Sequence, residues 1–592
     1  MVSGFEADRT SFRSQGVRRS LVWVLSLCFA LVALREAGAA PPLDDQAALR
    51  KPVDAISAAG GLLVANQESH SLSFLNAPLK QVEWESPLGS SPVALVSLGN
   101  TVGVLDFQDH LLRVVAVDPT GLRTIGQAET VRWPVAIVAL TETRLAVAGL
   151  WSRQIQFLER SNSSDQWTEA GVLRLPFNPR CLLPIGEGRL LVGDAFRGRL
   201  AVIDTTGPRI ESIREIHAHN IHGLVLSPDG ESVYLTHQLL DERAATTHEN
   251  VSLGILLSNL VRRIPLDALR DPGVNLESVS FRYFLGRTLE GAADPNGLAF
   301  AADGTLWVAL GGTNELCEVS ADGIEIRRHP AGTRPTRVLR RGDEIVTLDT
   351  LGDSLSIHRP GSAALDTVPL GPQRELSRAE LGERLFYNGR LSLESWMSCN
   401  SCHPDGHTHG LVADTASDGG FGNPKRTLSL LGTRDANPWA WNGQFRELHE
   451  QVRQSVTSSM QGPPVKPAQE IDLVSFLHTL RPPPPVDEVS GPEDAAQIER
   501  GRILFGKLGC AGCHIPPVTY TIDSVFDVGM PDERGQAKFN PPTLRGVSQR
   551  DRLFHDNRAA SLESVLDEFG HQLPRPLDRD ERSDLLRFLR SL

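Results

Sequence analysis

GRLLVGDAFRGRLAVID, residues 188–204, is a β-rich run, a turn and a second β-rich run, and this pattern recurs through the first two thirds of the chain. Six further copies are GGLLVANQESHSLSFL (60–75), NTVGVLDFQDHLLRVVAV (100–117), TRLAVAGLWSRQIQFL (143–158), ESVYLTHQLL (231–240), GTLWVALGGTNELCEV (304–319) and DEIVTLDTLGDSLSIH (343–358). Most begin about 40 to 45 residues after the previous copy, which is the period of a four-stranded propeller blade. Seven copies predict an all-β, seven-bladed propeller over residues 41–370.

One interval between copies is longer and contains the insertion DERAATTHENVSLGILLSNLVRRI, residues 241–264. Such insertions usually form a loop on one face, which either carries function or is a tolerated excursion. The histidines near it raise the idea of a metal site, but no tight ligand spacing supports one; they are His217, His219, His222, His237 and His248. The stretch SPDGESVYLTHQ (227–238) resembles the YVTN/NHL-like propellers of exported proteins, and this resemblance concerns architecture alone.

The N-terminus has the order of an export signal. Arg18 and Arg19 precede an apolar run at 21–34 and a small-residue stretch that ends at Ala40. A run of about 14 apolar residues is shorter than the roughly 20 that span a membrane. We therefore interpret residues 1–40 as a cleaved signal peptide and expect a periplasmic or otherwise exported protein with no stable membrane span after cleavage.

The composition argues against a nucleic-acid partner. The 592 residues include 72 Asp and Glu against 59 Lys and Arg, for a formal net charge of -13, and contain no long basic run. Nucleic-acid binders present a basic face to the phosphates. A hydrophobic content of 40% is ordinary for a multidomain globular protein.

Beyond residue 370 the pattern changes to helices, and one unit occurs twice. Capping boxes predict a helix from Ser377 through ELGERLF and another from Ser490 through ERGRILF. Each unit closes with a similar helix, DLVSFLHTL or DLLRFLRSL, and SLLGTRDANPWAWNGQFREL aligns without gaps with TLRGVSQRDRLFHDNRAASL. We predict two all-α domains joined by RPPPPVDEV, here called the first unit (371–484) and the second unit (485–592).

Each unit carries the motif Cys-x-x-Cys-His. The residues are Cys399, Cys402 and His403 in the first unit, and Cys510, Cys513 and His514 in the second. In this motif the thiols add to the vinyl groups of a heme and the histidine binds the iron. Zinc ribbons place their Cys pairs about 15 to 20 residues apart and redox dithiols lie in βαβ contexts, and neither description fits here.

Chance does not explain the two motifs. With 17 His in the chain, a histidine would follow a given Cys-x-x-Cys roughly 3% of the time. The pair of motifs therefore predicts two covalently bound c-type hemes, with His403 and His514 as iron ligands. Because such hemes are attached outside the cytoplasm, this prediction agrees with the export signal.

The part of the chain from about residue 375 to 592 resembles the diheme cytochrome c peroxidases and the related diheme enzyme that matures the tryptophylquinone cofactor of methylamine dehydrogenase. The resemblance rests on ELGERLFYNGRLSLESWMSCNSCH, WAWNGQ, NPPTLRGV and LFHDNRAASLESVL. It implies two class I cytochrome c-like domains, one heme whose iron is open to hydrogen peroxide, and one that receives electrons from a redox protein. It also implies that Trp441 carries electrons between the hemes, against the alternative that Trp441 is a core residue.

Several positions depart from the family pattern. The family's catalytic acid corresponds to Ser459 in TSSMQG, which puts peroxidase chemistry in doubt. The family's calcium-binding Asn corresponds to Arg426, so calcium remains an unsupported cofactor.

The sixth iron ligands also depart from the family. The methionine ligand of the electron-receiving heme corresponds to Phe569, and we expect His571 to replace it, with Met530 as a weaker candidate. For the first heme the candidates are Met460, His407, His409 or no protein ligand.

The sequence thus favours a periplasmic diheme oxidoreductase that reduces peroxide or oxidises a bound partner. The alternative, favoured by the missing acid at position 459, is a non-catalytic diheme electron-transfer protein whose propeller docks a redox partner. A third hypothesis gives the propeller a catalytic pocket of its own near the insertion 241–264.

Overall fold

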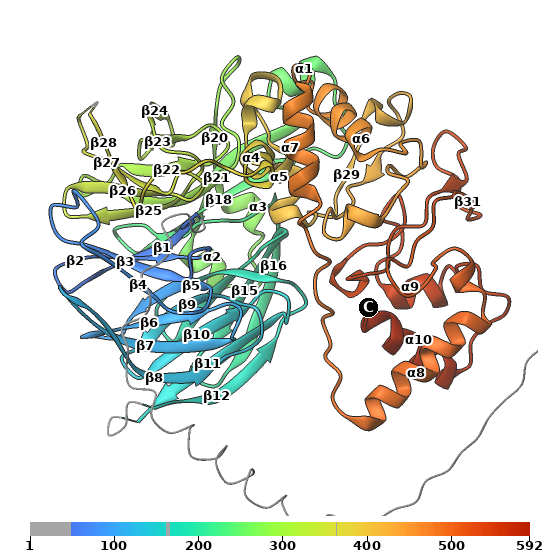
Figure 1. Cartoon of the computed structure of the whole chain (residues 1–592), viewed down its shortest axis with the longest axis horizontal. Helices are drawn as coiled ribbons and strands as arrows, with labels where there is room; N and C mark the ends of the chain where they lie inside the picture. The colour runs from blue at the N-terminus through green and yellow to red at the C-terminus, as the bar shows by residue number, and fades with distance from the viewer. Residues whose placement is uncertain (1–48, 162–165, 363) are drawn as a thin grey trace, which may run out of the picture. The chain divides into compact units, whose positions relative to one another are not determined.

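Twenty-eight strands follow one another in chain order through the first part of the described chain (Figure 1). The computed structural model describes residues 49–161, 166–362 and 364–592, so the predicted signal peptide lies outside the described residues. Five antiparallel sheets have four strands each, hydrogen-bonded in chain order. Their strands are β1 (Pro52–Ala58), β2 (Gly61–Asn66), β3 (Ser71–Leu75), β4 (Trp84–Pro87); β5 (Pro92–Ser97), β6 (Thr101–Asp106), β7 (Leu111–Asp118), β8 (Gly121–Glu129); β9 (Pro134–Thr141), β10 (Arg144–Gly149), β11 (Gln154–Arg160), β12 (Trp167–Arg174); β21 (Pro295–Phe300), β22 (Leu306–Leu310), β23 (Glu315–Val319), β24 (Glu325–Pro330); and β25 (Pro335–Arg341), β26 (Glu344–Asp349), β27 (Ser354–His358), β28 (Leu365–Pro369).

The other eight strands form one larger antiparallel sheet. They are β13 (Pro179–Pro184), β14 (Arg189–Asp194), β15 (Arg197–Asp204), β16 (Arg209–His219), β17 (Leu224–Leu226), β18 (Ser232–Leu240), β19 (Leu257–Pro265) and β20 (Phe281–Leu285). Its halves meet where His219 of β16 pairs with Gln238 of β18. The strands β1, β5, β9 and β13 contact one another in turn, β13 contacts β17, β17 contacts β21, and β21 contacts β25, which contacts β1, so the series closes on itself. The prediction of a strand-rich region of curled, propeller-like sheets is confirmed.

The repeat recognised in the sequence is the central hairpin of a sheet in six of the seven copies, whereas the copy at 231–240 forms the single strand β18, whose partner β19 lies at the end of the insertion. Residues 188–204 form β14 and β15, which pair antiparallel from Arg189 with Asp204 to Gly193 with Leu200. These central strands are buried on both faces, as in β14, and therefore read as continuous apolar runs. Outer strands such as β12 are largely exposed and lack that pattern.

Helices dominate the described chain after β28. They are α4 (Arg378–Phe386), α5 (Cys399–Cys402), α6 (Leu448–Gln454), α7 (Pro467–Leu477), α8 (Pro492–Lys507), α9 (Leu562–Asp567) and α10 (Arg579–Arg590), while α1 (His248–Ser252), α2 (Leu266–Arg270) and α3 (Leu276–Val279) lie among the strands. Each unit also has a pair of two-residue strands that an all-α description omits: β29 (Val412–Ala413) with β30 (Lys425–Arg426), and β31 (Phe526–Asp527) with β32 (Lys538–Phe539).

The first and last helices of each unit cross at a glycine. Where α4 packs on α7, a Cβ at Gly382 would lie 1.9 Å from the carbonyl oxygen of Asp472. Where α8 packs on α10, a Cβ at Gly501 would lie 2.1 Å from the carbonyl oxygen of Asp584. Only a residue without a side chain permits so close an approach. The two units therefore share one helix-crossing geometry.

The helix starts agree with the predicted caps in one unit and not in the other. Ser377 caps α4, and its capping box with Glu380 is present as predicted. The prediction that Ser490 caps α8 is wrong, because Gly491 occupies the N-cap position. Instead, the N–H of Ser490 donates to the carboxylate of Asp494 at 2.8 Å, since a proline at the first helical position shifts the start by one residue.

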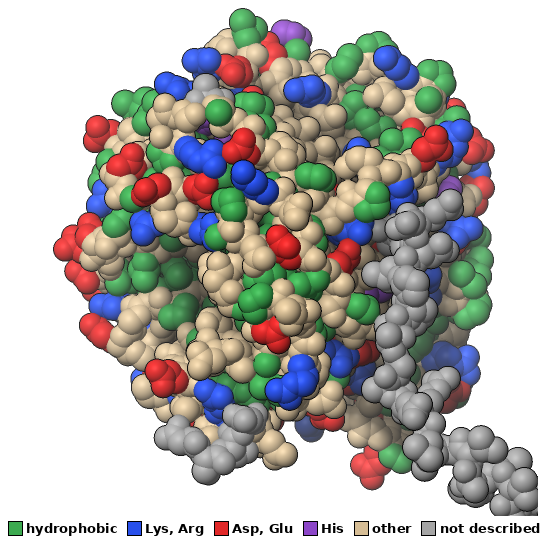
Figure 2. Space-filling view, turned by 60° about the vertical axis from the view of Figure 1, so that its left-hand side comes forward, with side chains coloured by type: hydrophobic (Ala, Val, Ile, Leu, Met, Phe, Trp, Pro, Cys, Tyr) green, Lys and Arg blue, Asp and Glu red, His purple; other side chains and the backbone are tan. Residues whose placement is uncertain are grey.

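The surface drawn in Figure 2 mixes acidic, basic and apolar side chains. The larger exposed apolar side chains include Phe281 and Phe284 of β20, which are 57% and 58% exposed. Among the residues described, none of the helices has both the length and the apolar character that crossing a bilayer requires.

Candidate functional site

The first Cys-x-x-Cys-His motif forms a single helical turn, α5. The N–H of His403 donates to the carbonyl of Cys399 at 2.9 Å, so both thiols and the imidazole lie on one segment. Cys399 and Cys402 pack beside a buried apolar cluster that includes Met460. Burial raises the pKa of both thiols to about 12 and lowers the pKa of His403 to about 4.

A buried carboxylate of the propeller holds this turn. Asp294, which is 2% exposed and precedes β21, accepts hydrogen bonds from the hydroxyls of Ser398 at 2.5 Å and Ser401 at 2.7 Å. Gln238 of β18 donates to the Ser401 hydroxyl at 3.0 Å. Burial raises the pKa of Asp294, and the two hydroxyls oppose that shift. The propeller thus binds the residues on either side of Cys399.

One histidine near the insertion also reaches this motif. Nε2 of His219 donates to the carbonyl of Ser401 at 3.0 Å, and its ring centre lies 4.7 Å from that of His409. His237 is buried and faces Arg262, whereas His217 and His248 are exposed. In the described part of the chain no three His, Cys, Asp or Glu residues form a group that could hold a metal ion.

The insertion 241–264 packs on the first unit. Glu242 accepts a hydrogen bond from the N–H of Val412 at 2.8 Å, and the N–H of Thr246 donates to Asp414 at 2.9 Å. Gly254, with φ of 65°, lies against the ring of Trp396, where a Cβ would be only 2.6 Å from the ring. Residues 241–256 of the insertion are therefore part of the interface between the propeller and the first unit, whereas residues 257–264 do not form a loop but belong to β19 of the propeller sheet.

The second motif lies in a 3₁₀ turn, Cys510–Gly512. The N–H of His514 donates to the carbonyl of Cys510 at 3.0 Å, and its Nδ1 donates to the carbonyl of Tyr520 at 2.9 Å. This bond leaves the lone pair of the neutral ring on Nε2. Burial lowers the pKa of His514 to about 4. The apolar cluster that Cys510 contacts is built from the second unit.

Trp441 lies where the two units meet. It is 9% exposed, and its Nε1 donates to the carbonyl of Arg426 in the first unit at 2.8 Å. Its own carbonyl accepts from the N–H of Asn540 in the second unit at 2.8 Å, and its ring centre is 6.3 Å from that of His555. Both the bridging and the core hypotheses agree with this burial.

Two of the ligand candidates for the first heme are held by other contacts. The N–H of Leu411 donates to Nδ1 of His409 at 3.0 Å, so the neutral ring carries its proton on Nε2 and has no lone pair there. Nδ1 of His407 lies 2.9 Å from the hydroxyl of Ser429, and its ring packs 4.7 Å from that of Phe196 in the propeller. The bond from Leu411 disfavours His409 as a ligand, whereas His407 is held against the propeller by the packing of its ring on Phe196.

Two of the remaining ligand candidates, Met460 and His571, lie close to their motifs. Met460 is 6% exposed in the cluster beside Cys399. His571 is close enough to His514 to lower its pKa further, and Nδ1 of His571 is buried without a hydrogen bond. Phe569, at the family's methionine position, instead packs 5.4 Å from Phe554.

The two departures from the family pattern are visible in the structure. Ser459 ends a π-helical turn, Ser455–Ser459, and offers a hydroxyl where the family has a carboxylate. Nε of Arg426 donates to the carbonyl of Phe554 at 3.0 Å. Position 426 therefore supplies a hydrogen-bond donor and not an oxygen ligand for calcium.

The groups at the two motifs fit covalent heme. All four motif cysteines are free thiols, and both motif histidines are neutral at pH 7, as iron ligation requires. A redox dithiol needs a lowered thiol pKa, and burial raises the pKa of Cys399 and Cys402.

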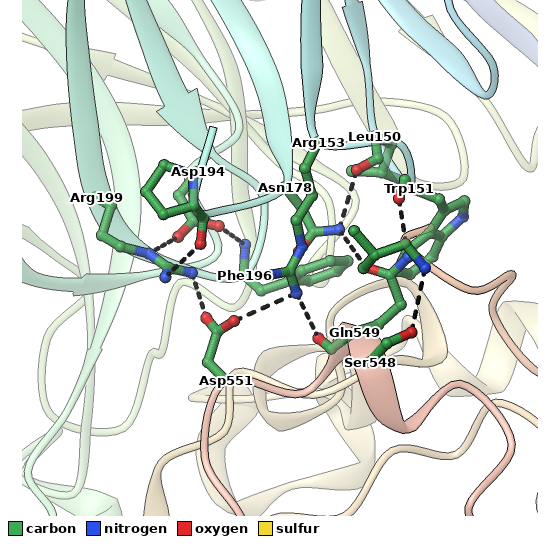
Figure 3. Close-up of polar contacts among 12 residues, drawn as sticks. Leu150, Trp151, Arg153, Asn178, Asp194, Phe196, Arg199, Ser548, Gln549 and Asp551 are labelled. Atoms are coloured by element: carbon green, nitrogen blue, oxygen red, sulfur yellow. Dashed lines mark hydrogen bonds and ion pairs between the residues drawn. The ribbon is translucent and has the colours of Figure 1, made fainter. Parts of the chain in front are cut away.

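The second unit contacts the propeller through the loop shown in Figure 3 and through the ion pairs of Arg174 with Asp487 (2.5 Å) and of Arg132 with Glu488 (2.7 Å). Asn178 donates to the side chain of Gln549 at 3.0 Å, and Gln549 donates to the carbonyl of Trp151 at 2.9 Å. Asp551 pairs with Arg153 at 3.3 Å and also with Arg199. This contact is polar and ionic, whereas the first unit shares an apolar core with the propeller.

Sequence reasoning missed the propeller residues that bind the first motif. Asp294 and Gln238 lie more than 100 residues before Ser398 in the chain, and no local pattern links them. A signal was present for the helix crossings, because Gly382 and Phe386 in ELGERLF have the same spacing as Gly501 and Phe505 in ERGRILF.

Comparison with known proteins agrees with the motif analysis. Residues 376–475 match the family described as di-haem cytochrome c peroxidase. The chain is 29% identical to methylamine utilization protein MauG of Methylorubrum extorquens, across 38% of this chain and 79% of MauG. It is 28% identical to cytochrome c551 peroxidase of Nitrosomonas europaea, across 36% of this chain and 79% of the relative.

Among solved structures, hydrazine synthase of Kuenenia stuttgartiensis is similar over 55% of this chain and 99% of that chain, with a TM-score of 0.45 and 17% identity. At that level the similarity carries no information on function. The family match at residues 376–475 contains the first Cys-x-x-Cys-His motif. The C-terminal part of this protein is therefore a relative of the di-haem cytochrome c peroxidases and MauG, as its motifs predicted.

Proposed function

We propose that this protein is an exported diheme c-type cytochrome of the peroxidase type, which takes electrons from a redox protein and uses them to reduce peroxide or to oxidise a bound partner. The observation that carries the proposal is the occurrence of one heme-attachment unit twice, with Trp441 hydrogen-bonded to both copies. A c-type heme bound at each motif supplies a redox-active iron.

The proposal gives the motif residues defined roles. Cys399 and Cys402 hold one heme and Cys510 and Cys513 the other, while His403 and His514 bind the irons through Nε2. His571 and Met460 are the candidates for the sixth positions. Trp441, buried between the units, passes electrons from the second site to the first. The family relationship supports heme oxidoreductase activity, and Ser459 leaves the acid that assists O–O cleavage unassigned.

The architecture is part of the same proposal. The eight-stranded sheet counts as two blades, because its halves meet through one residue pair, and seven four-stranded blades follow. We assign the propeller to residues 41–370 and the class I cytochrome c-like domains to 371–484 and 485–592. We assign residues 1–40 to an export signal, since heme attachment outside the cytoplasm requires one.

The second motif is the proposed docking point for the electron donor. Ile515 and Val518, just after it, are 42% and 63% exposed. The first motif is instead covered by Asp294 and Gln238 of the propeller. A redox protein therefore has closer access to the second heme than to the first.

The test is the paramagnetic-resonance and absorption spectrum of the purified ferric protein, before and after hydrogen peroxide, at rest and half-reduced. A high-spin centre that responds to peroxide supports the enzyme. Two low-spin centres indifferent to peroxide even when half-reduced would support the alternative, a diheme electron-transfer protein.

Two tryptophan variants test whether Trp441 carries electrons between the hemes or is a core residue. Trp441→Phe should slow electron transfer between the hemes at least tenfold with both hemes retained. Trp439→Phe, whose indole only bonds Thr433, is the control. Equal rates in the two variants would assign Trp441 to the core.

A further inference from the structure

Two arginines between the units lack an acidic partner among the described residues: Arg426, which is buried, and Arg550, which is half-buried. Four arginines with little exposed surface do pair with carboxylates: Arg262 with Glu277 (3.1 Å), Arg328 with Glu325 (2.8 Å), Arg199 with Asp194 (2.5 Å) and Arg153 with Asp551 (3.3 Å). A buried charge without a partner is strongly destabilising. These two sites therefore require an explanation.

The protein groups around the two guanidinium groups do not neutralise them. Arg426 is 3% exposed; it donates to the carbonyl of Phe554 and lies 5.3 Å from the ring centre of Trp441. Arg550 donates to the carbonyl of Arg545 at 3.3 Å. Burial lowers the pKa of Arg426 to about 9, with a further contribution from the charge of Arg550, whose own pKa burial lowers to about 10. Both groups are therefore still cationic at pH 7.

Both side chains line the same small cavity, which is rich in positive charge. Its wall also includes Arg197 and Arg552, and the loop Thr408, His409 and Gly410 that follows the first motif. Asp551 is the one acidic residue among the lining residues, and it already pairs with Arg153 and Arg199. The cavity thus offers several cationic donors and no free carboxylate.

We propose that Arg426 and Arg550 bind a propionate carboxylate of one of the two hemes. This inference rests on the proposed attachment of heme at the two motifs. The propionates are the anionic substituents of a c-type heme, and the loop after His403 forms one wall of the cavity. Arginine is the residue best suited to bidentate recognition of a carboxylate. A free inorganic anion would satisfy the same chemistry and is distinguished by the test.

The experiment uses the holoprotein and the variants Arg426→Gln, Arg550→Gln and Arg550→Lys. The control is Arg500→Gln, which removes an exposed arginine paired with Asp584 in the second unit. Intact mass gives the number of hemes attached, and potentiometric titration gives both midpoint potentials. A nearby cation stabilises the reduced heme, so each Gln variant should lower one midpoint beyond the scatter of the control, and Arg550→Lys should restore it.

The outcomes separate this inference from the proposed function. Absence of attached heme from the wild type overturns both. Two attached hemes with unchanged midpoints in both Gln variants overturn the inference alone. Midpoints that follow the phosphate concentration in the wild type, together with phosphate binding lost in the variants, would assign the cavity to a free anion and also overturn it. If Arg426→Gln fails to accumulate, the pair of Arg550 variants decides the question.

Discussion

The two Cys-x-x-Cys-His motifs lie in units of the same construction and in different surroundings. The first motif contacts an apolar cluster that also contains Leu240 and Leu257 of the propeller, and Asp294 binds the serines beside its thiols. The second contacts a cluster built from its own unit and is followed by exposed apolar side chains. The two units thus provide the same helical scaffold for heme attachment, and contact with the propeller gives the first motif surroundings that the second motif lacks.

This difference gives the propeller a role that its fold does not reveal. Its residues surround the first motif within the same chain, so that face is not free to dock another protein there. The first heme site is thereby insulated, which favours chemistry at that site. The second site remains accessible, which favours exchange of electrons with a partner.

The largest expected effect is the loss of one heme at a time. Cys399→Ala with Cys402→Ala should remove the first heme and leave a second heme that a donor still reduces. Cys510→Ala with Cys513→Ala should leave a first heme that still responds spectrally to peroxide but is no longer reduced by the donor. Steady-state peroxide turnover should fall at least 100-fold in both.

Intact mass checks that one heme is lost in each double variant, and rapid-mixing absorption follows the remaining heme. If the heme left at the first motif were inert to peroxide and the one at the second reacted, the assignment of the two sites would be reversed.

The second effect concerns the buried carboxylate at the first motif. Asp294→Ala leaves the hydroxyls of Ser398 and Ser401 without their acceptor, and should lower the free energy of unfolding by about 2 to 4 kcal/mol. Asp584→Ala, which breaks an exposed pair with Arg500 in the second unit, should cost about 0 to 1 kcal/mol. Denaturant titration of both variants makes the comparison, and equal losses would contradict the special position of the first motif.

Much of this arrangement could be predicted from local sequence. Continuous apolar runs identified the central strands because both of their faces are buried, and the spacing of Cys399, Cys402 and His403 is set by the chemistry of heme attachment. The outer strands could not be recognised in the sequence because their exposed positions weaken the apolar pattern, as in β12.

What could not be predicted depends on contacts between distant segments. The position of Asp294 against Ser398 follows from how the ring of sheets meets the first unit, and no periodicity records that. The proton position on His409 follows from one hydrogen bond with Leu411. The prediction that Ser490 caps α8 was wrong because a proline begins the helix one residue later, so even a local capping motif did not fix the helix start.

The third effect should be the same in both units. Gly382→Ala and Gly501→Ala each place a methyl group about as close to a facing carbonyl oxygen, at 1.9 and 2.1 Å. Overpacking of this kind costs about 1 to 3 kcal/mol. Thermal unfolding of the two variants should show similar losses. A loss of thermal stability in only one variant would mean that the helix crossing is tightly packed in only one unit.

The smallest effect is a pH dependence of opposite sign at the two propeller contacts. Burial alone would raise the pKa of Asp551, but the charges of Arg199 and Arg153 outweigh burial and lower it. The contribution of Asp551 to stability is therefore present above the unfolded pKa near 3.8 and is lost as the pH falls. The pKa of Asp294 is raised by burial, so its contribution is fully present below the unfolded value and is lost as the pH rises through the folded one. Lowering the pH from 6 toward 3 should therefore loosen the second unit from the propeller and tighten the first.

Hydrogen exchange of the loop around Gln549 and of the α5 turn measures the two contacts in one sample. Asp551→Asn should abolish the change at the loop and leave α5 as in the wild type, whereas parallel changes at both contacts would show that the two units do not differ in how they are held.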